Sequence, residues 1–125
     1  MSATEHAIEL VHAAARAASD KLAQQIIAFD VSEQLAITDA FVLASAANDR
    51  QVKAIVDEVE DKLREIGAKP IRREGQRDGR WVLIDYGDVV VHVQHEEERS
   101  FYALERLWRD CPVIDLPADV VSHER

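Results

Sequence analysis

Cysteine is nearly absent from this sequence, which contains a single one, Cys111, among 125 residues. One cysteine cannot close an internal disulfide, and no second cysteine begins a spacing typical of a zinc site. A reactive thiol is the less favoured alternative, because Cys111 has no catalytic-cysteine context around it. We therefore interpret Cys111 as a structural thiol.

Long apolar runs are also missing. The longest strongly apolar segments, such as Trp81 to Ile84 and Val89 to Val91, fall far short of the roughly 20 residues that span a bilayer. The N-terminal segment contains Glu5 and Glu9 and lacks the basic region and apolar block of a signal peptide. The sequence therefore predicts no membrane helix and a cytoplasmic location.

Glycine is scarce, and the four glycines do not form a phosphate-binding loop. Neither GxGxxG nor GxxxxGKS/T occurs, the spacings in which backbone N–H groups surround phosphates. Ser45 and Ser100 lie in no nucleophile elbow, so nucleophilic catalysis has no local signature. Acid–base pairs are assembled in space, so these absences only disfavour catalysis. We predict a protein that is not an enzyme and uses no cofactor or small-molecule substrate.

A metal site built from Asp85, Asp88, His92 and His95 is a weak alternative. Side chains alternate across a strand, so His92 and His95 point to opposite faces if Val89 to His95 is a regular strand. Two such side chains cannot easily share one ion. The sequence therefore predicts histidines that serve in packing or at an interface, and no metal site.

Basic residues are outnumbered, with 15 Lys and Arg against 24 Asp and Glu and a net charge of -9. Nucleic-acid affinity comes largely from cations that displace counterions, so a phosphate backbone is disfavoured as the main partner. The acidity is equally consistent with a basic protein partner and with a surface that is merely soluble. One basic cluster is typical of a solvated hairpin or of a minor RNA contact. It comprises Lys69, Arg72, Arg73, Arg77 and Arg80.

The first half of the chain predicts two helices around two strands. Apolar residues from Ile8 to Leu22 recur with the period of an amphipathic helix. The segments Gln25 to Phe29 and Phe41 to Ala44 predict strands, joined by a polar loop over residues 30–39. Asn48 and the glutamine three residues later resemble a capping box, which opens a second helix that ends at glycine 67.

The second half predicts three strands and a final helix. Residues 71–74 predict a short edge strand after a proline, and residues 75–79 a polar turn. Trp81 to Tyr86 and Val89 to His95 predict an antiparallel hairpin around Gly87-Asp88. Glu96 to Glu98 then precede a predicted helix with Phe101, Leu104 and Trp108 on one face, which Pro112 ends.

The element order is therefore α-β-β-α-β-β-β-α, and the fold class is α/β (α+β). A mixed sheet flanked by helices is the economical way to bury the apolar faces of such a string. We predict one domain over residues 1–112 and an irregular C-terminal tail over residues 113–125. Neither an internal repeat nor a linker-like composition divides the chain.

The strand from Trp81 to Tyr86 is apolar on both of its faces. Val82, Ile84 and Tyr86 share one face, and Trp81, Leu83 and Asp85 share the other. A sheet buried on both sides explains this pattern and is favoured by physics alone. The alternative is that Trp81 is an interface anchor rimmed by acids.

The segment from Trp81 to Trp108, WVLIDYGDVVVHVQHEEERSFYALERLW, closely resembles the ribosomal silencing factor family, also known as the Iojap family. In that family a tryptophan strand leads to a Gly-Asp hairpin, a V-H-V strand and an acidic R-x-F/L/Y-Y-x-L-E-x-L-W helix. Upstream, IIAFDV and ITDAFVLASAANDRQVKAI resemble its first two strands and second helix. The resemblance covers residues 7 to 110. Ala46-Ala47 departs from the Gly-Thr pair of many members.

The resemblance implies a five-stranded, nucleotidyltransferase-like fold without the catalytic signature. It implies binding to ribosomal protein L-fourteen on the large ribosomal subunit, which would block subunit joining and repress translation, notably under nutrient limitation. It also implies self-association as a homodimer and, with the basic cluster, a minor contact with ribosomal RNA. The contact residues that it implies are Trp81, Asp85, Tyr86, Asp88, Val89 and His92, with Tyr102 and Glu105 as weaker additions.

Two other functions remain as alternatives. A nucleotidyltransferase-like nucleotide-binding enzyme is suggested by the implied fold and by Asp85 and Asp88, although fold alone does not determine function. The segment from Ala44 to Asn48 contains no glycine for a Gly-Ser phosphate loop, which counts against it. A dimeric scaffold with a partner outside the ribosome is the third possibility.

Overall fold

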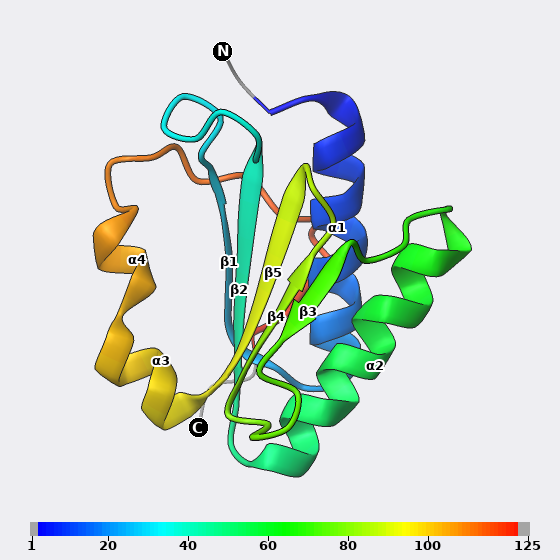
Figure 1. Cartoon of the computed structure of the whole chain (residues 1–125), viewed down its shortest axis with the longest axis vertical. Coiled ribbons are helices and arrows are strands. Elements are labelled where there is room, and N and C mark those ends of the chain that lie inside the picture. Colours follow the sequence, from blue (N-terminus) through cyan, green and yellow to red (C-terminus); the bar gives the residue numbers. More distant parts are fainter. Residues whose placement is uncertain (1–2, 123–125) are drawn as a thin grey trace.

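A computed structural model of the chain describes residues 3–122. Two long helices, α1 and α2, cover one face of a central sheet, whereas two short helices, α3 and α4, lie against the other face (Figure 1). Within residues 3–122, none of the helices has both the length and the hydropathy that a membrane span requires. The elements are α1 (Glu5–Asp20), β1 (Gln24–Asp30), β2 (Ala40–Ala46), α2 (Asp49–Glu65), β3 (Arg72–Glu74), β4 (Trp81–Asp85), β5 (Val89–His95), α3 (Glu96–Tyr102) and α4 (Leu104–Leu107).

The sheet has five strands in the order β1-β2-β5-β4-β3. β2 and β5 run parallel, and the other neighbouring strands are antiparallel. The predicted mixed sheet flanked by helices is therefore confirmed, as is the predicted edge strand β3. Because β5 lies between β2 and β4, it is buried along almost its whole length.

Both ends of α2 have the predicted local chemistry. The Asn48 side chain accepts a hydrogen bond from the backbone N–H of Gln51 at 2.9 Å. The Gln51 side chain accepts from the N–H of Ala47 at 2.8 Å, one residue earlier than in a standard capping box. At the other end Gly67 has φ of +87°, and the residue after it donates to the carbonyl of Leu63. This left-handed glycine ends the helix as a Schellman motif does.

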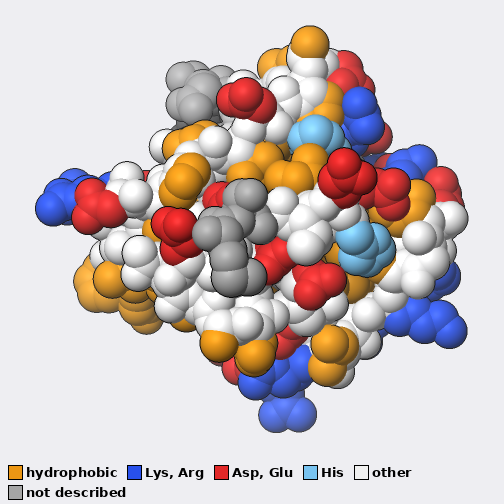
Figure 2. Space-filling model, turned by 90° about the horizontal axis from the view of Figure 1, so that it is seen from above, with side chains coloured by type: hydrophobic (Ala, Val, Ile, Leu, Met, Phe, Trp, Pro, Cys, Tyr) orange, Lys and Arg blue, Asp and Glu red, His pale blue; other side chains and the backbone are white. Residues whose placement is uncertain are grey.

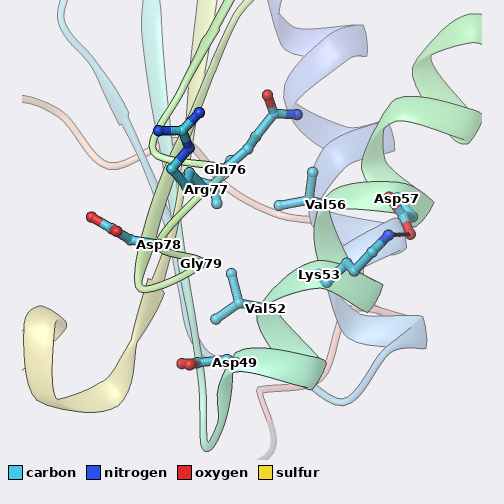
Figure 3. A pocket seen from close by; sticks show the side chains of 10 residues that line it. Asp49, Val52, Lys53, Val56, Asp57, Gln76, Arg77, Asp78 and Gly79 are labelled. Carbon is cyan, nitrogen blue, oxygen red and sulfur yellow. Dashed lines mark hydrogen bonds and ion pairs between the residues drawn. The ribbon is translucent and has the colours of Figure 1, made fainter.

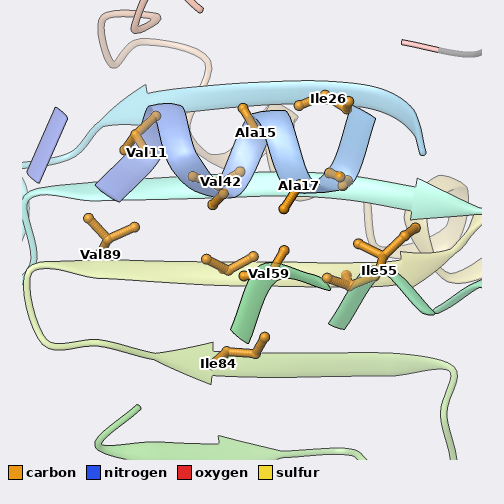
Figure 4. Packing of buried hydrophobic residues seen from close by; sticks show 14 of the residues in the cluster. Val11, Ala15, Ala17, Ile26, Val42, Ile55, Val59, Ile84 and Val89 are labelled. Atoms are coloured by element: carbon orange, nitrogen blue, oxygen red, sulfur yellow. The ribbon is translucent and has the colours of Figure 1, made fainter. Parts of the chain in front are cut away.

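The main core lies between the two long helices and the sheet (Figure 4). Val11 and Ala15 of α1 and Ile55 and Val59 of α2 point onto strand residues such as Val42, and all five are fully buried. Small alanines allow α1 to approach the sheet closely. Burial of this apolar area is the main stabilising contribution to the fold.

A second, smaller core lies on the opposite face. Phe29, Leu43 and Cys111 are buried there with Val31, and Trp108 packs against them. Burial raises the pKa of the Cys111 thiol, in agreement with its interpretation as a structural residue. This core is formed mainly by β1, β2 and the segment around α4, so it covers only part of the face.

The final helix differs from its prediction. The chain breaks at Ala103, whose φ is +47°, and this residue separates α3 from α4. Because the break changes the direction of the chain, Phe101 does not share a face with Leu104 and Trp108. Phe101 is 81% exposed, whereas Leu104 and Trp108 are partly buried in the second core.

The segment after α4 packs along the sheet edge and α1. The N–H of Ile114 donates to the carbonyl of Ala28 at 2.9 Å, and the side chain of Ile114 is buried in the main core. Further on, Arg16 and Asp119 form an ion pair at 3.1 Å. This segment passes behind the sheet to α1 (Figure 1) and covers the outer edge of β1.

Candidate docking surface

β4 divides its side chains between the two faces of the sheet. Val82 and Ile84 are buried beneath the long helices. Trp81, Leu83 and Asp85 point to the face of α3 and α4 and are only partly buried. The expectation of a sheet buried on both sides is therefore met on one side only. We call the partly open surface formed by Trp81, Leu83, Asp85, His92 and Tyr102 the docking face.

Trp81 is held in place by its own chain. Its indole N–H donates to Nδ1 of His92 at 3.1 Å, and its ring centroid lies 4.8 Å from that of Tyr102. Because the N–H already has a partner, the ring itself is what Trp81 offers to another molecule.

Aromatic rings form a continuous row across this face. Successive ring centroids lie between 4.8 and 6.0 Å apart, as is usual for interacting rings. One end of the row is packed into the second core, whereas at the other end Tyr102 is 49% exposed and its neighbour Phe101 still more so. The row comprises Phe101, Tyr102, Trp81, His92, Phe41 and Trp108.

His92 is the buried polar centre of the docking face. Only 6% of it is exposed, and burial lowers the pKa of its imidazole to about 4. Because Nδ1 accepts the hydrogen bond from Trp81, the proton of the neutral ring is on Nε2. His92 is therefore neutral near pH 7 and fixes the orientation of the Trp81 indole.

Leu83 belongs to the docking face and Phe101 lies beside it, but neither was predicted as a site residue. Leu83 and Trp81 line a shallow hollow of about 280 Å³ together with Glu74 and Gly75 of the β3 segment. The alternation of the strand could have identified Leu83, since it lies between Trp81 and Asp85 on one face. Phe101 could not be identified, because the predicted helix placed it on an apolar, packed face.

Tyr86 and Val89 lie on the other side of the sheet. Both are buried in the main core, and the N–H of Tyr86 donates to the carbonyl of Val89 at 2.9 Å. Burial, together with the negative charge of Glu60, raises the pKa of the Tyr86 phenol to about 12. Strand alternation thus separates these two predicted contact residues from Trp81, and they do not share its surface.

The two aspartates of the hairpin have different surroundings. Asp85 accepts a hydrogen bond from the N–H of Gly87 at 2.8 Å and lies 3.6 Å from the guanidinium of Arg72. Asp88 is exposed at the turn, where its backbone carbonyl accepts from the N–H of Asp39. Asp85 therefore stiffens the turn and borders the docking face, whereas Asp88 lies at the end of the molecule.

That end carries many acidic side chains. Figure 2 views it from above, with the β1–β2 loop and the β4–β5 turn toward the reader. Asp and Glu side chains gather near the middle of this view, whereas Lys and Arg lie toward its outline. Acidic side chains therefore face solvent at the end of the molecule where the hairpin turns.

Glu105 is engaged within the chain. Its carboxylate accepts a hydrogen bond from Nε of Arg99 at 2.9 Å, and Arg99 is buried. The ion pair joins α3 to α4 across the break at Ala103. Glu105, one of the predicted contact residues, therefore holds α3 and α4 together.

The basic cluster is largely neutralised by neighbouring acids. Arg72, Arg73 and Arg80 each form an ion pair with a carboxylate. Lys69 and Arg77 are exposed. The partners of the three arginines are Glu74, Glu60 and Glu97.

A hollow lies on the other side of the sheet, between α2 and the loop before β4 (Figure 3). Its volume is about 410 Å³, its floor includes Val52 and Val56, and Lys53 and Asp57 form an ion pair at 3.0 Å on its wall. Within residues 3–122 no three His, Cys, Asp or Glu side chains are grouped to hold a metal ion.

Taken together, these features define a small α/β protein with one sheet face closed by helices and one partly open aromatic face. The chain belongs to the ribosomal silencing factor family: the family model "Ribosomal silencing factor during starvation" matches residues 4–125. It is 46% identical over 103 residues to "Ribosomal silencing factor RsfS" of Bacillus subtilis (strain 168), covering 82% of this chain and 87% of that protein.

Other similarities extend this result. "Protein Iojap, chloroplastic" of Zea mays is 34% identical over 108 residues, which are 84% of this chain and 46% of that protein. A crystal structure from Chromobacterium violaceum has a TM-score of 0.78 at 34% identity, covering 94% of each chain. One from Bacillus halodurans has a TM-score of 0.76 at 41% identity, covering 86% of this chain and 98% of that one. The family membership supports ribosome-associated repression of translation.

Proposed function

We propose that this protein binds ribosomal protein L-fourteen on the large ribosomal subunit through the docking face. The subunit surface that it occupies would be the one on which the small subunit docks, so joining is blocked by steric exclusion. Translation is repressed without a chemical step, in the cytoplasm and under nutrient limitation. The observation that carries the proposal is the partly open Trp81 surface in a member of the silencing factor family.

The physical character of the docking face fits a basic protein partner. Trp81, Leu83 and Tyr102 supply aromatic and apolar area of the kind that anchors protein interfaces. Asp85 on this face and Asp88 at the adjacent turn supply carboxylates for charge-assisted hydrogen bonds with Lys or Arg. The net charge of -9 favours approach to a basic surface and opposes nucleic acid as the main partner.

Ribosomal RNA is a secondary contact in this proposal. Since three arginines of the basic cluster are paired with acids, we assign the contact to Lys69 and Arg77. Loss of these two charges should reduce the salt dependence of subunit binding only slightly. Titration of the Lys69→Gln, Arg77→Gln double variant against large subunits at several salt concentrations measures this effect.

Self-association as a homodimer is also part of the proposal. Exposed apolar residues outside the main core, such as Phe101 and Leu107, could be covered by a second copy. Sedimentation equilibrium over a range of concentrations should then give a mass near twice 14.1 kDa. A mass that stays at one chain up to high concentration would remove the dimer from the proposal.

The decisive experiment is substitution of Trp81. Trp81→Ala should lower co-sedimentation with purified large subunits by at least about tenfold, because a central aromatic anchor is lost. Leu22→Ala is the matched control, since Leu22 is an exposed apolar residue between α1 and β1. Circular dichroism of both variants verifies the fold. Wild-type sedimentation of Trp81→Ala would show that Trp81 is not in the interface.

A second measurement tests the mechanism. Purified wild-type protein is added to separated subunits, and the fraction of joined ribosomes is read from a sucrose gradient. The proposal expects the protein in the large-subunit peak and fewer joined ribosomes. Migration with neither subunit contradicts the proposed function as a whole.

A further inference from the structure

Arg80 lies where β4 begins, beside the starts of α2 and α3. Its guanidinium contacts Glu97 at 2.7 Å and Glu98 at 3.1 Å, and it lies 4.0 Å from Asp49 of α2. Its backbone carbonyl accepts a hydrogen bond from the N–H of His95 at 2.7 Å. One residue therefore joins the strand that carries Trp81 to the first turn of the helix that carries Tyr102.

We propose that Arg80 is a positioning residue for the docking face, because it holds the start of α3 against β4 and so keeps the Tyr102 ring against Trp81. The inference deepens the proposed function and rests on it. Arg80 acts through α3 and does not itself need to contact the ribosome. We call its contacts with Glu97 and Glu98 the Arg80 clamp.

The charge arrangement explains why a clamp is needed at this point. Glu96, Glu97 and Glu98 form the first turn of α3, and three adjacent carboxylates repel one another. Arg80 places one cation between two of them. The hydrogen bonds of the clamp raise the pKa of Arg80 and lower the pKa of Glu97. Both groups therefore stay charged near pH 7.

The short length of α3 makes its start important. The helix has seven residues, fewer than an isolated helix needs to be stable in water. Its far end is held by the Arg99–Glu105 ion pair and by the contact between Tyr102 and Trp81. Loss of the clamp should therefore loosen α3 and leave the fold intact, since neither core includes Arg80.

The test compares two ways of opening the clamp. Arg80→Gln removes the cation, and the double variant Glu97→Gln, Glu98→Gln removes both acids. Each should speed hydrogen exchange of the α3 amides by about two- to fivefold, the range expected for exposed ion pairs. Each should weaken large-subunit binding by a similar factor. The combined triple variant should be no worse than either one, because all three remove the same interaction.

Two further variants separate positioning from simple charge. Arg80→Lys keeps the charge but loses the forked geometry, so it should fall between wild type and Arg80→Gln. Arg50→Gln removes an equal charge from an exposed position in α2 and should change neither measurement.

The outcomes distinguish this inference from the proposed function. Weaker binding of Arg80→Gln with unchanged α3 exchange would overturn the inference, because Arg80 would then contact the partner directly. Unchanged exchange in both clamp variants would also overturn it. If wild-type protein does not bind large subunits at all, the proposed function fails, whereas the exchange measurement still decides whether Arg80 holds α3.

Discussion

The two faces of the sheet differ in their side chains and in how far they are covered. The face beneath α1 and α2 is closed by aliphatic side chains such as Ile55, Val59 and Leu63, all fully buried. The face beneath α3 and α4 contains aromatic rings, a neutral histidine and the ion pair of buried Arg99 with partly exposed Glu105, and it is closed only in part. Because the long helices already bury the main core, the aromatic face can remain partly open to solvent.

The largest effect is expected at low pH, which should destabilise the aromatic face through His92. The pKa of His92 is lowered from 6.5 to about 4 in the folded protein, so the unfolded chain binds the proton more tightly. Its contribution to stability is therefore complete above pH 6.5 and is lost as the pH falls toward 4, with a total of about 3 kcal/mol. Urea unfolding at a series of pH values between 7 and 4 measures this loss.

His92→Phe is the control for that titration. It removes the ionisable group from the docking face, so the decline in unfolding free energy between pH 6.5 and 5 should become much shallower. His6→Gln, at an exposed position of α1, should leave the decline as in wild type. An equal pH dependence in wild type and His92→Phe would contradict the burial of a neutral His92.

The neighbouring residues Val82 and Leu83 test the comparison directly, since they point to opposite faces. Val82→Ala should lower the free energy of unfolding by about 2 kcal/mol, because it leaves a cavity in the main core, and should leave large-subunit binding unchanged. Leu83→Ala should weaken binding by about tenfold with a smaller loss of stability. Urea unfolding and co-sedimentation of the two variants give both quantities. If the effects are reversed, the assignment of the two faces is wrong.

The smallest effect is expected at the break between α3 and α4. Ala103 has φ of +47°, a conformation that costs a residue with a Cβ more than it costs glycine. Ala103→Gly should therefore raise the free energy of unfolding by about 0.5 kcal/mol, after the greater entropy of glycine in the unfolded chain is counted. Thermal unfolding measures it. Ala54→Gly, inside α2, should instead lower the free energy of unfolding by about 1 kcal/mol. A similar decrease for Ala103→Gly would show that the backbone of Ala103 is not strained.

Much of the fold could be predicted because its signals are local. The Asn48 cap, the Gly67 helix end and the Gly87 turn each depend on residues within a few positions. The break at Ala103 could not be predicted, since alanine ordinarily favours helix. The break allows two contacts that lie in different directions. Trp108 packs into the second core, and Tyr102 lies on Trp81.

The residues predicted as contacts do not all lie on one surface of the structure. Trp81, Asp85 and His92 lie together on the docking face, with Tyr102 brought beside them by α3. Tyr86 lies on the opposite face, as strand alternation requires. A motif specifies neighbours along the chain, whereas a binding surface is defined by neighbours in space.

Composition and short-range pattern were enough to predict the strands, the long helices, the acidic character and the family resemblance. They could not predict which sheet face stays partly open, since both faces of β4 are apolar and nothing local distinguishes them. The long helices bury Val82 and Ile84 of β4 on one face, whereas the broken α3–α4 segment is too short to cover the other. For that reason Trp81 is a surface residue and Ile84 is a core residue.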